Sequence, residues 1–270
     1  MENKNIKIQN VNILIAGSGS SIDMLQKSKY LNKLYITSEE KFPGVLNIKF
    51  NTFRELAAKC KALQIDLVIV EEEKWIQQGI VDVLRQNLIN CLGATAKWTE
   101  LGLYNSVPRK LLPKYNINIP KKIILPVDFP ILVKADGITR KANSVQEIIQ
   151  IRKEIFNQSS EIGNTIYLEK YIEGKTYVVT SLFDTKHLIT FPNAEIPAEL
   201  LDNYSKNLER MLIGENANFT GFINSKLVLS NNKLYNTGFS FNFLKPECNI
   251  DFLYLLNLTI YQKLNEIPFE

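Results

Sequence analysis

The chain has 270 residues, of which 45% are hydrophobic and 22% charged, with a formal net charge of +4. This composition excludes intrinsic disorder, and a single histidine with three scattered cysteines excludes a histidine-cluster metal site, a zinc ribbon and a disulfide framework. The weak charge predicts no nucleic-acid partner, no segment approaches the ~18 apolar residues of a membrane span, and the cysteine pattern favours a cytoplasmic protein.

Apolar strands alternate with amphipathic helices over residues 1–100. In chain order we expect a strand at 11–16, a helix at 23–30, strands at 34–37 and 47–50, a helix at 52–63, a strand at 66–70, a helix at 75–87 and a strand at 89–92. This alternation is typical of a doubly wound parallel sheet, which binds ligands at the carboxyl ends of its strands. Those ends carry 17–21 and 71–73 here, and the acidic run 71–73 is expected to be a solvated loop.

Residues 101–270 have an α+β pattern. Helices are expected over 97–115, 145–156, 198–214 and 251–264, and strands over 131–135, 165–168, 177–184, 187–191, 222–229 and 233–240. The strands 177–184 and 187–191 are expected to pair antiparallel, and the last two strands to form a hairpin across 230–232. The fold class predicted is therefore α/β, with a doubly wound parallel-sheet domain at 1–100 and an α+β domain at 101–270.

Two strand ends carry groups suited to a nucleotide. Lys134 closes the apolar strand 131–135, where a lysine can reach a phosphate as a point charge. The alternative is an ordinary exposed lysine. The segment 167–174 passes from a strand into a connector whose backbone groups can bond to an adenine edge, and the alternative there is an edge strand with alternating charges. The nucleotide-binding candidates are Lys134, Glu169, Lys170, Tyr171 and Ile172.

Signals for phosphate and metal chemistry are sparse elsewhere. Glycine makes up 12 of 270 residues, about 4% against a typical ~7%. The G-S-G-S turn at 17–20 lacks the third glycine of a dinucleotide fingerprint. Magnesium prefers hard oxygen ligands, yet 235–242 reads Y-N-T-G-F-S-F-N and contains no carboxylate. We expect His187, in a hairpin, to lie at the surface. No metal site and no catalytic residue are assigned.

Taken in order, these segments resemble the phosphoribosylamine–glycine ligase (glycinamide ribonucleotide synthetase) family of ATP-grasp enzymes of purine synthesis. The most specific match is P-I-L-V-K-A-D-G at 130–137, close to the family's P-x-V-V-K-A-D-G. Further matches are I-A-G-S-G-S at 15–20, Glu73 with G-I-V-D at 79–82, L-G-A-T at 92–95, the adenine connector at 168–174, T-G-F at 220–222 and P-E at 246–247. The resemblance implies substrate contacts at Gly17, Ser18, Gly19 and Glu73.

Departures from the family fall on its phosphate, metal and substrate groups. The lysine before the lid is replaced by Asn105, a ribose-binding glutamate by Thr176 and a phosphate-binding arginine by Asn242. The magnesium-binding L-E-F-N falls at 237–240, T-G-F-S, so both metal ligands are lost. The glycine-rich loop after K-A-D-G is missing, and the long substrate loop is reduced to 193–197. The family's C-terminal domain is expected to be absent.

The resemblance therefore implies a pre-ATP-grasp domain followed by an ATP-grasp domain with a reduced lid at about 121–190. We expect a degenerate member with little or no ligase activity, weak ATP or ADP binding without magnesium, or a regulatory role through a protein partner or homo-oligomer. One alternative is an active ATP-dependent carboxylate–amine ligase whose metal site is rebuilt from new positions. The acids available for it are Glu195, Glu199, Glu247 and Asp251. A scaffolding protein without a ligand is the third possibility.

Overall fold

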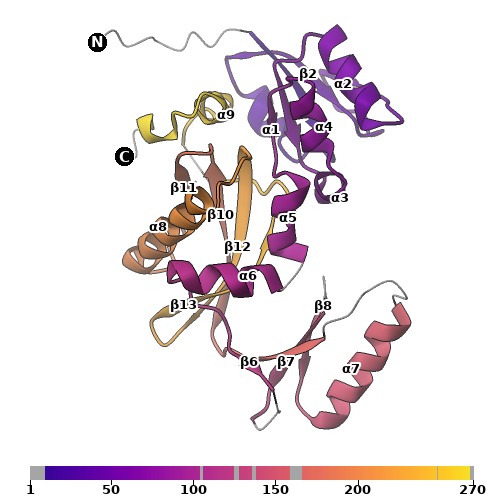
Figure 1. The fold of residues 1–270 in the computed structure, drawn as a ribbon. Coiled ribbons are helices and arrows are strands. Elements are labelled where there is room, and N and C mark those ends of the chain that lie inside the picture. The colour runs from indigo at the N-terminus through magenta and orange to yellow at the C-terminus, as the bar shows by residue number, and fades with distance from the viewer. Residues whose placement is uncertain are drawn as a thin grey trace.

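The computed structural model describes residues 10–103, 106–124, 128–135, 138–158, 166–247 and 249–267. Within these residues the strands form an N-terminal sheet, a central sheet and a smaller lid sheet (Figure 1). The predicted fold class is confirmed, because a parallel α/β unit is followed by an α+β unit with antiparallel sheets. None of the helices in the described ranges is long and apolar enough to cross a membrane.

The N-terminal sheet is parallel, with strand order β3-β2-β1-β4-β5. Successive side chains of β1 enter different cores, Leu14 in one and Ile13 in the other, so this strand is buried on both faces. Thr52 caps α2, because its hydroxyl accepts a hydrogen bond from the Glu55 N–H at 3.1 Å. The elements are β1 (Val11–Ala16), α1 (Ile22–Gln26), β2 (Leu31–Ile36), β3 (Val45–Asn47), α2 (Phe53–Ala62), β4 (Leu67–Val70), α3 (Glu73–Gln77), α4 (Ile80–Gln86) and β5 (Cys91–Leu92).

The central sheet is antiparallel, with strand order β11-β10-β12-β13. Both predicted antiparallel pairs are present in it, and the helix predicted over 198–214 forms with those bounds. The helix predicted over 97–115 is instead divided into shorter pieces, the last of which has Pro113 in its first turn. The elements are α5 (Ala96–Leu103), α6 (Ser106–Leu111), η1 (Leu112–Tyr115), β10 (Lys175–Phe183), β11 (Leu188–Thr190), α8 (Ala198–Gly214), β12 (Gly221–Ser230), β13 (Lys233–Ser240), α9 (Phe252–Ile260) and η2 (Leu264–Glu266).

The lid is a four-stranded sheet with one helix on it, set apart from the other sheets in Figure 1. Its elements are β6 (Lys122–Ile123), β7 (Ile131–Ala135), β8 (Ile138–Ala142), α7 (Val145–Gln158) and β9 (Tyr167–Lys170), in strand order β6-β9-β7-β8. The lid thus ends at β9, earlier than the predicted limit of about 190, because β10 pairs with β12 of the central sheet. Ala135 pairs with Ile138, which leaves only residues 136 and 137 between β7 and β8 and no length for a glycine-rich loop.

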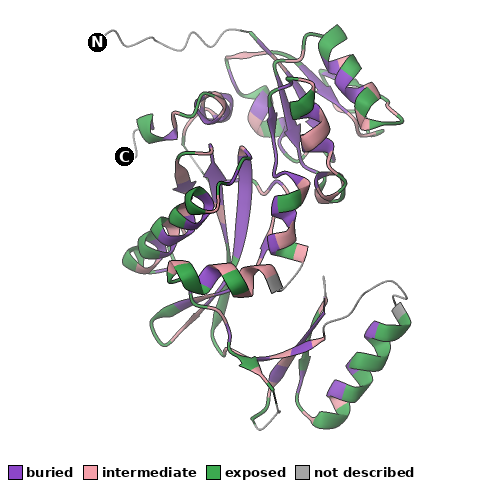
Figure 2. Ribbon diagram, in the orientation of Figure 1, coloured by how far each residue is buried: buried purple, intermediate pink, exposed green. Residues whose placement is uncertain are grey.

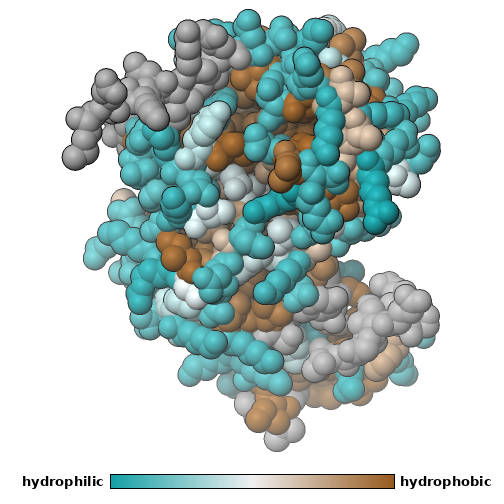
Figure 3. All heavy atoms as spheres, turned by 45° about the horizontal axis from the view of Figure 1, so that its top comes forward, coloured by the Kyte–Doolittle hydropathy of each residue, from teal (hydrophilic) through white to brown (hydrophobic). Residues whose placement is uncertain are grey.

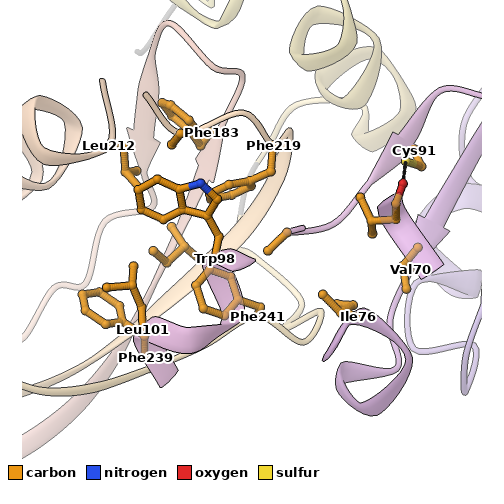
Figure 4. Packing of buried hydrophobic residues seen from close by; sticks show 14 of the residues in the cluster. Val70, Ile76, Cys91, Trp98, Leu101, Phe183, Leu212, Phe219, Phe239 and Phe241 are labelled. Carbon is orange, nitrogen blue, oxygen red and sulfur yellow. Dashed lines mark hydrogen bonds between the residues drawn. The ribbon is translucent and has the colours of Figure 1, made fainter. Parts of the chain in front are cut away.

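An aromatic core joins the N-terminal unit to the central sheet. Trp98 of α5 packs against Phe219, which in turn contacts Phe183 and Phe241 (Figure 4). The Gly93 N–H donates a hydrogen bond to the Thr220 carbonyl at 2.8 Å across the same junction. Buried residues concentrate in the strands and the inner helix faces (Figure 2), and hydrophilic residues cover most of the face shown in Figure 3.

Candidate nucleotide site

A cavity of about 330 Å³ lies between the lid and the central sheet. Of the surrounding elements, α6, β7 and β13 are labelled in Figure 1. The apolar wall of the cavity combines side chains from the lid and from the central unit: Leu101, Leu112, Leu132, Ile138, Ile172, Val228 and Phe239. Its charged groups are Arg109, Lys134, Glu169 and Lys226. A concave apolar site with a few convergent polar groups is the usual form of a small-molecule site.

Lys134 is buried in this cavity rather than exposed at a strand end. Its ammonium lies 2.9 Å from Glu169 Oε2 and donates a hydrogen bond to the Thr237 carbonyl at 3.0 Å, and both charged side chains are only 4% exposed. Arg109 binds the other oxygen of Glu169. One carboxylate therefore pairs with two cations, so that each of these charges has an opposite charge beside it.

The predicted connector residues divide between the cavity and the surface. Tyr171 and Ile172 line the cavity, and the Lys141 ammonium lies 4.3 Å from the centre of the Tyr171 ring. Lys170 does not line it: its side chain is exposed, and its backbone N–H donates to the Lys121 carbonyl at 2.9 Å. Glu169 contributes an ion pair to the cavity.

The cavity does not fit a magnesium ion. Gly238 and Ser240, at the positions the resemblance assigns to metal ligands, carry no carboxylate, and the carboxylate of Glu169 is engaged by Arg109 and Lys134. Over the described parts of the chain, no cluster of three or more histidine, cysteine or acidic residues is arranged to hold a metal. Of the acids considered for a rebuilt site, Glu195 pairs with Lys175 at 2.7 Å and Asp251 accepts a hydrogen bond from Ser28 Oγ at 2.8 Å.

The turn after β1 is filled by the protein's own carboxylate. Glu71 accepts hydrogen bonds from the backbone N–H groups of Gly19, Ser20 and Ser21 at 2.8, 2.9 and 2.8 Å, and from the Ser18 hydroxyl at 3.3 Å. Glu71 is only 6% exposed, so the prediction of a solvated loop is wrong for this residue. Successive backbone N–H groups in a turn form an anion-binding concavity, and here Glu71 is the anion.

The remaining predicted substrate residues lie close to that turn. A Cβ on Gly17 would come within 2.7 Å of the Glu71 Cβ, so glycine allows the close approach of the two loops. The Gly17 N–H donates to Thr37 Oγ1 at 3.0 Å. Glu73 accepts a hydrogen bond from the Phe241 N–H at 3.2 Å and so links α3 to the chain that follows β13.

Sequence reasoning missed three functional candidates, and two of them carry no local sequence signal. Arg109 and Glu71 acquire their roles through tertiary contacts with residues 60 and about 50 positions away. Lys226 had a readable signal, because residues 226 and 228 alternate onto one face of β12 and both line the cavity.

The fold is shared with solved ATP-grasp ligases. Biotin carboxylase from Campylobacter jejuni superposes with a TM-score of 0.73 at 12% identity, over 93% of this chain and 71% of that one. D-alanine–D-alanine ligase from Bacillus anthracis, in complex with ATP, gives 0.61 at 17% identity, over 97% of this chain and 100% of that one. Phosphoribosylamine–glycine ligase from Thermotoga maritima gives 0.66 at 14% identity, over 86% and 69%. The chain therefore has an ATP-grasp fold.

Within this class the sequence matches lead to one family. Residues 11–102 match the model of the phosphoribosylglycinamide synthetase N domain. The phosphoribosylamine–glycine ligase of Fusobacterium nucleatum is 22% identical over 323 aligned positions, covering 96% of this chain and 75% of that protein. That of Methanosphaera stadtmanae is 25% identical, over 68% of this chain and 48% of its own length. The chain is thus similar in sequence to the phosphoribosylamine–glycine ligases, the family that its motifs resemble.

The length of the alignment with the Fusobacterium nucleatum ligase agrees with the shorter loops of this chain. An alignment of 323 positions is longer than the whole chain of 270 residues, so the Fusobacterium nucleatum protein contains segments that this chain lacks. The match to the Methanosphaera stadtmanae ligase spans about half the length of that relative.

Proposed function

We propose that this protein is a catalytically impaired relative of phosphoribosylamine–glycine ligase that binds an adenine nucleotide weakly in the lid cavity. The observation that carries the proposal is the state of the cavity's acidic group: Glu169 is engaged by Lys134 and Arg109, and no carboxylate stands at Gly238 or Ser240. Phosphoryl transfer depends on cations that neutralise the developing charge. Loss of even one electrostatic group typically costs ~10²–10³-fold in rate.

The turn at Glu71 supports the same proposal from the N-terminal unit. The resemblance assigns substrate contacts to Gly17, Ser18 and Gly19, but the N–H group of Gly19 is hydrogen-bonded to the Glu71 carboxylate. A negatively charged substrate group would meet a like charge at that place. A protein that binds a nucleotide without consuming it is suited to regulation, and we propose that it acts through a protein partner or a second copy of the chain.

Calorimetric titration tests the proposal. We expect ATP and ADP to release heat at millimolar concentration, because the cavity keeps Lys134 and an apolar slot with Tyr171. Lys134→Met should weaken binding about tenfold, since a hydrogen bond to a charged group contributes about 1.5–3 kcal/mol. The matched control is Lys206→Met, which removes an exposed lysine on α8. Absence of heat with both nucleotides would contradict the proposal.

A further inference from the structure

We propose that Lys226 takes the place of a divalent metal ion in the lid cavity, so that a nucleotide binds there in its metal-free form. This inference rests on the proposed nucleotide binding and adds to it the charge state of the ligand. It follows from three features of the described cavity: the position of Lys226, the balance of charge around it, and the shape and chemistry of the wall.

Lys226 is placed by the pairing of β12 with β13. It lies directly opposite Gly238 in the antiparallel register, and both residues line the cavity. A Cβ built on Gly238 would lie 3.8 Å from the Lys226 Cδ, so the aliphatic stem of the lysine runs over the glycine. A glycine at 238 leaves this path open, because it has no side chain to compete with the lysine stem.

Thr237 makes a hydrogen bond to each of the two cavity lysines. Its hydroxyl donates a hydrogen bond to the Lys226 carbonyl at 3.1 Å, and its own carbonyl accepts one from the Lys134 ammonium at 3.0 Å. Lys134 is buried within the cavity, whereas Lys226 is an exposed residue that lines it.

The charges in the cavity do not cancel. The described lining residues include three cations, Arg109, Lys134 and Lys226, and one acid, Glu169. The carboxylate of Glu169 forms ion pairs with Arg109 and Lys134. None of the ion pairs found in the described part of the chain involves Lys226. Over the described lining residues the net charge is thus positive, with Lys226 as the available cation, and the described residues hold no cluster of acids arranged to bind a metal.

A positive cavity with an apolar wall selects an anion that carries an aromatic group. The wall residues Leu132, Ile172 and Phe239 and the ring of Tyr171 can enclose a purine, while Lys226 binds the phosphate as a point charge. Magnesium bound to the nucleotide would cancel part of the negative charge that attracts it and would bring a second cation toward Lys226. The expected ligand is therefore a purine nucleotide in its metal-free form.

Titration of the full chain with ADP, once with excess EDTA and once with excess magnesium, tests this inference. We expect ADP to bind at least about threefold more tightly in EDTA. In EDTA, Lys226→Met should lose tenfold or more in affinity, because it removes a charged partner of the phosphate, and Lys226→Arg should retain most of it. Lys233→Met serves as the matched control, since Lys233 lies at the exposed start of β13 and outside the cavity lining.

The outcomes separate this inference from the proposed function. If wild-type protein binds ADP but magnesium strengthens binding, or if Lys226→Met binds like Lys233→Met, the metal-replacing role is overturned and the nucleotide site stands. If wild-type protein binds ADP in neither condition, the proposed function itself fails, and this inference fails with it. Thermal unfolding of each variant without nucleotide shows whether an affinity loss comes from misfolding.

Discussion

The carboxylate of Glu71 accepts a hydrogen bond from the backbone N–H of Gly19 at 2.8 Å and joins the loop after β4 to the turn after β1. The N–H groups of Ser20 and Ser21 bind the same carboxylate. These are the carboxyl ends of adjacent parallel strands, where doubly wound sheets bind ligands. The protein therefore closes, with its own side chain, the place where such a fold offers an anion site.

Glu71→Ala should lower the free energy of unfolding by about 1–3 kcal/mol, because it leaves the buried Ser21 N–H and the partly buried Gly19 and Ser20 N–H groups without their acceptor. Urea denaturation followed by circular dichroism measures the change. Glu72→Ala is the matched control, since its neighbour Glu72 is exposed. Equal stability of the two variants would show that the Glu71 contacts contribute nothing.

Glu169→Gln should destabilise the protein by about 3–5 kcal/mol, because it leaves the buried Lys134 and the partly buried Arg109 without their counter-ion. Added ADP should raise the melting temperature of this variant more than that of the wild type, since the freed cations gain an anionic partner. Glu173→Gln, in the exposed part of the connector, controls for the loss of one negative charge. A variant as stable as Glu173→Gln would contradict the shared-carboxylate role.

Gly221→Ala should cost about 2 kcal/mol or more, because a Cβ there would lie 2.6 Å from the Gly93 nitrogen at a φ of +156°. This contact joins β12 to the N-terminal unit. Gly238→Ala provides the comparison within the same hairpin: its Cβ would meet its nearest neighbour at 3.8 Å, so its stability should change by less than about 1 kcal/mol. Chemical denaturation of both variants measures the difference.

Patterns local in the sequence predicted the fold well. The alternation of apolar runs and helices gave the parallel sheet, and α8 forms over the predicted residues because its apolar spacing is strong and a proline precedes it. Lys134 was identified from its strand end and does lie in the cavity. The lid boundary was placed too late because strand periodicity does not say which sheet a strand joins, as β10 shows.

The charge partners of the site could not be predicted in the same way. Glu71 stands in an E-E-E run, which has the composition of a solvated loop, and only the folded turn reveals the N–H groups that draw it inward. Arg109 and Glu169 meet across 60 residues of sequence. Pairings of this kind depend on how two separate elements are docked, and neither partner carries a local signal of it.

The stability of the protein should fall at high pH through Cys91. Burial raises the pKa of this thiol from 9.0 to about 12. Between these values the unfolded chain releases the thiol proton and the native chain keeps it, so the unfolded state binds fewer protons and stability decreases as pH rises. The slope is about 1.4 kcal/mol per pH unit for one such group.

Cys91→Ala removes the ionisable thiol, so the unfolding free energy of the variant should decline less steeply above pH 9. Any stability lost through poorer packing is the same at every pH and does not alter this slope. Urea unfolding of wild type and variant at a series of pH values from 8 to about 10.5 measures both slopes. Parallel slopes would mean that the Cys91 thiol ionises alike in the native and unfolded states.

The proposal that this chain binds a nucleotide without turning it over is tested most directly by a steady-state assay of ADP formation. Protein, MgATP, glycine and phosphoribosylamine are combined, and each substrate is omitted in turn. We expect ADP formation no faster than in the protein-free mixture, because no carboxylate stands at Gly238 or Ser240 and the turn at Gly19 is filled by Glu71. ADP formation that requires both glycine and phosphoribosylamine would contradict the account.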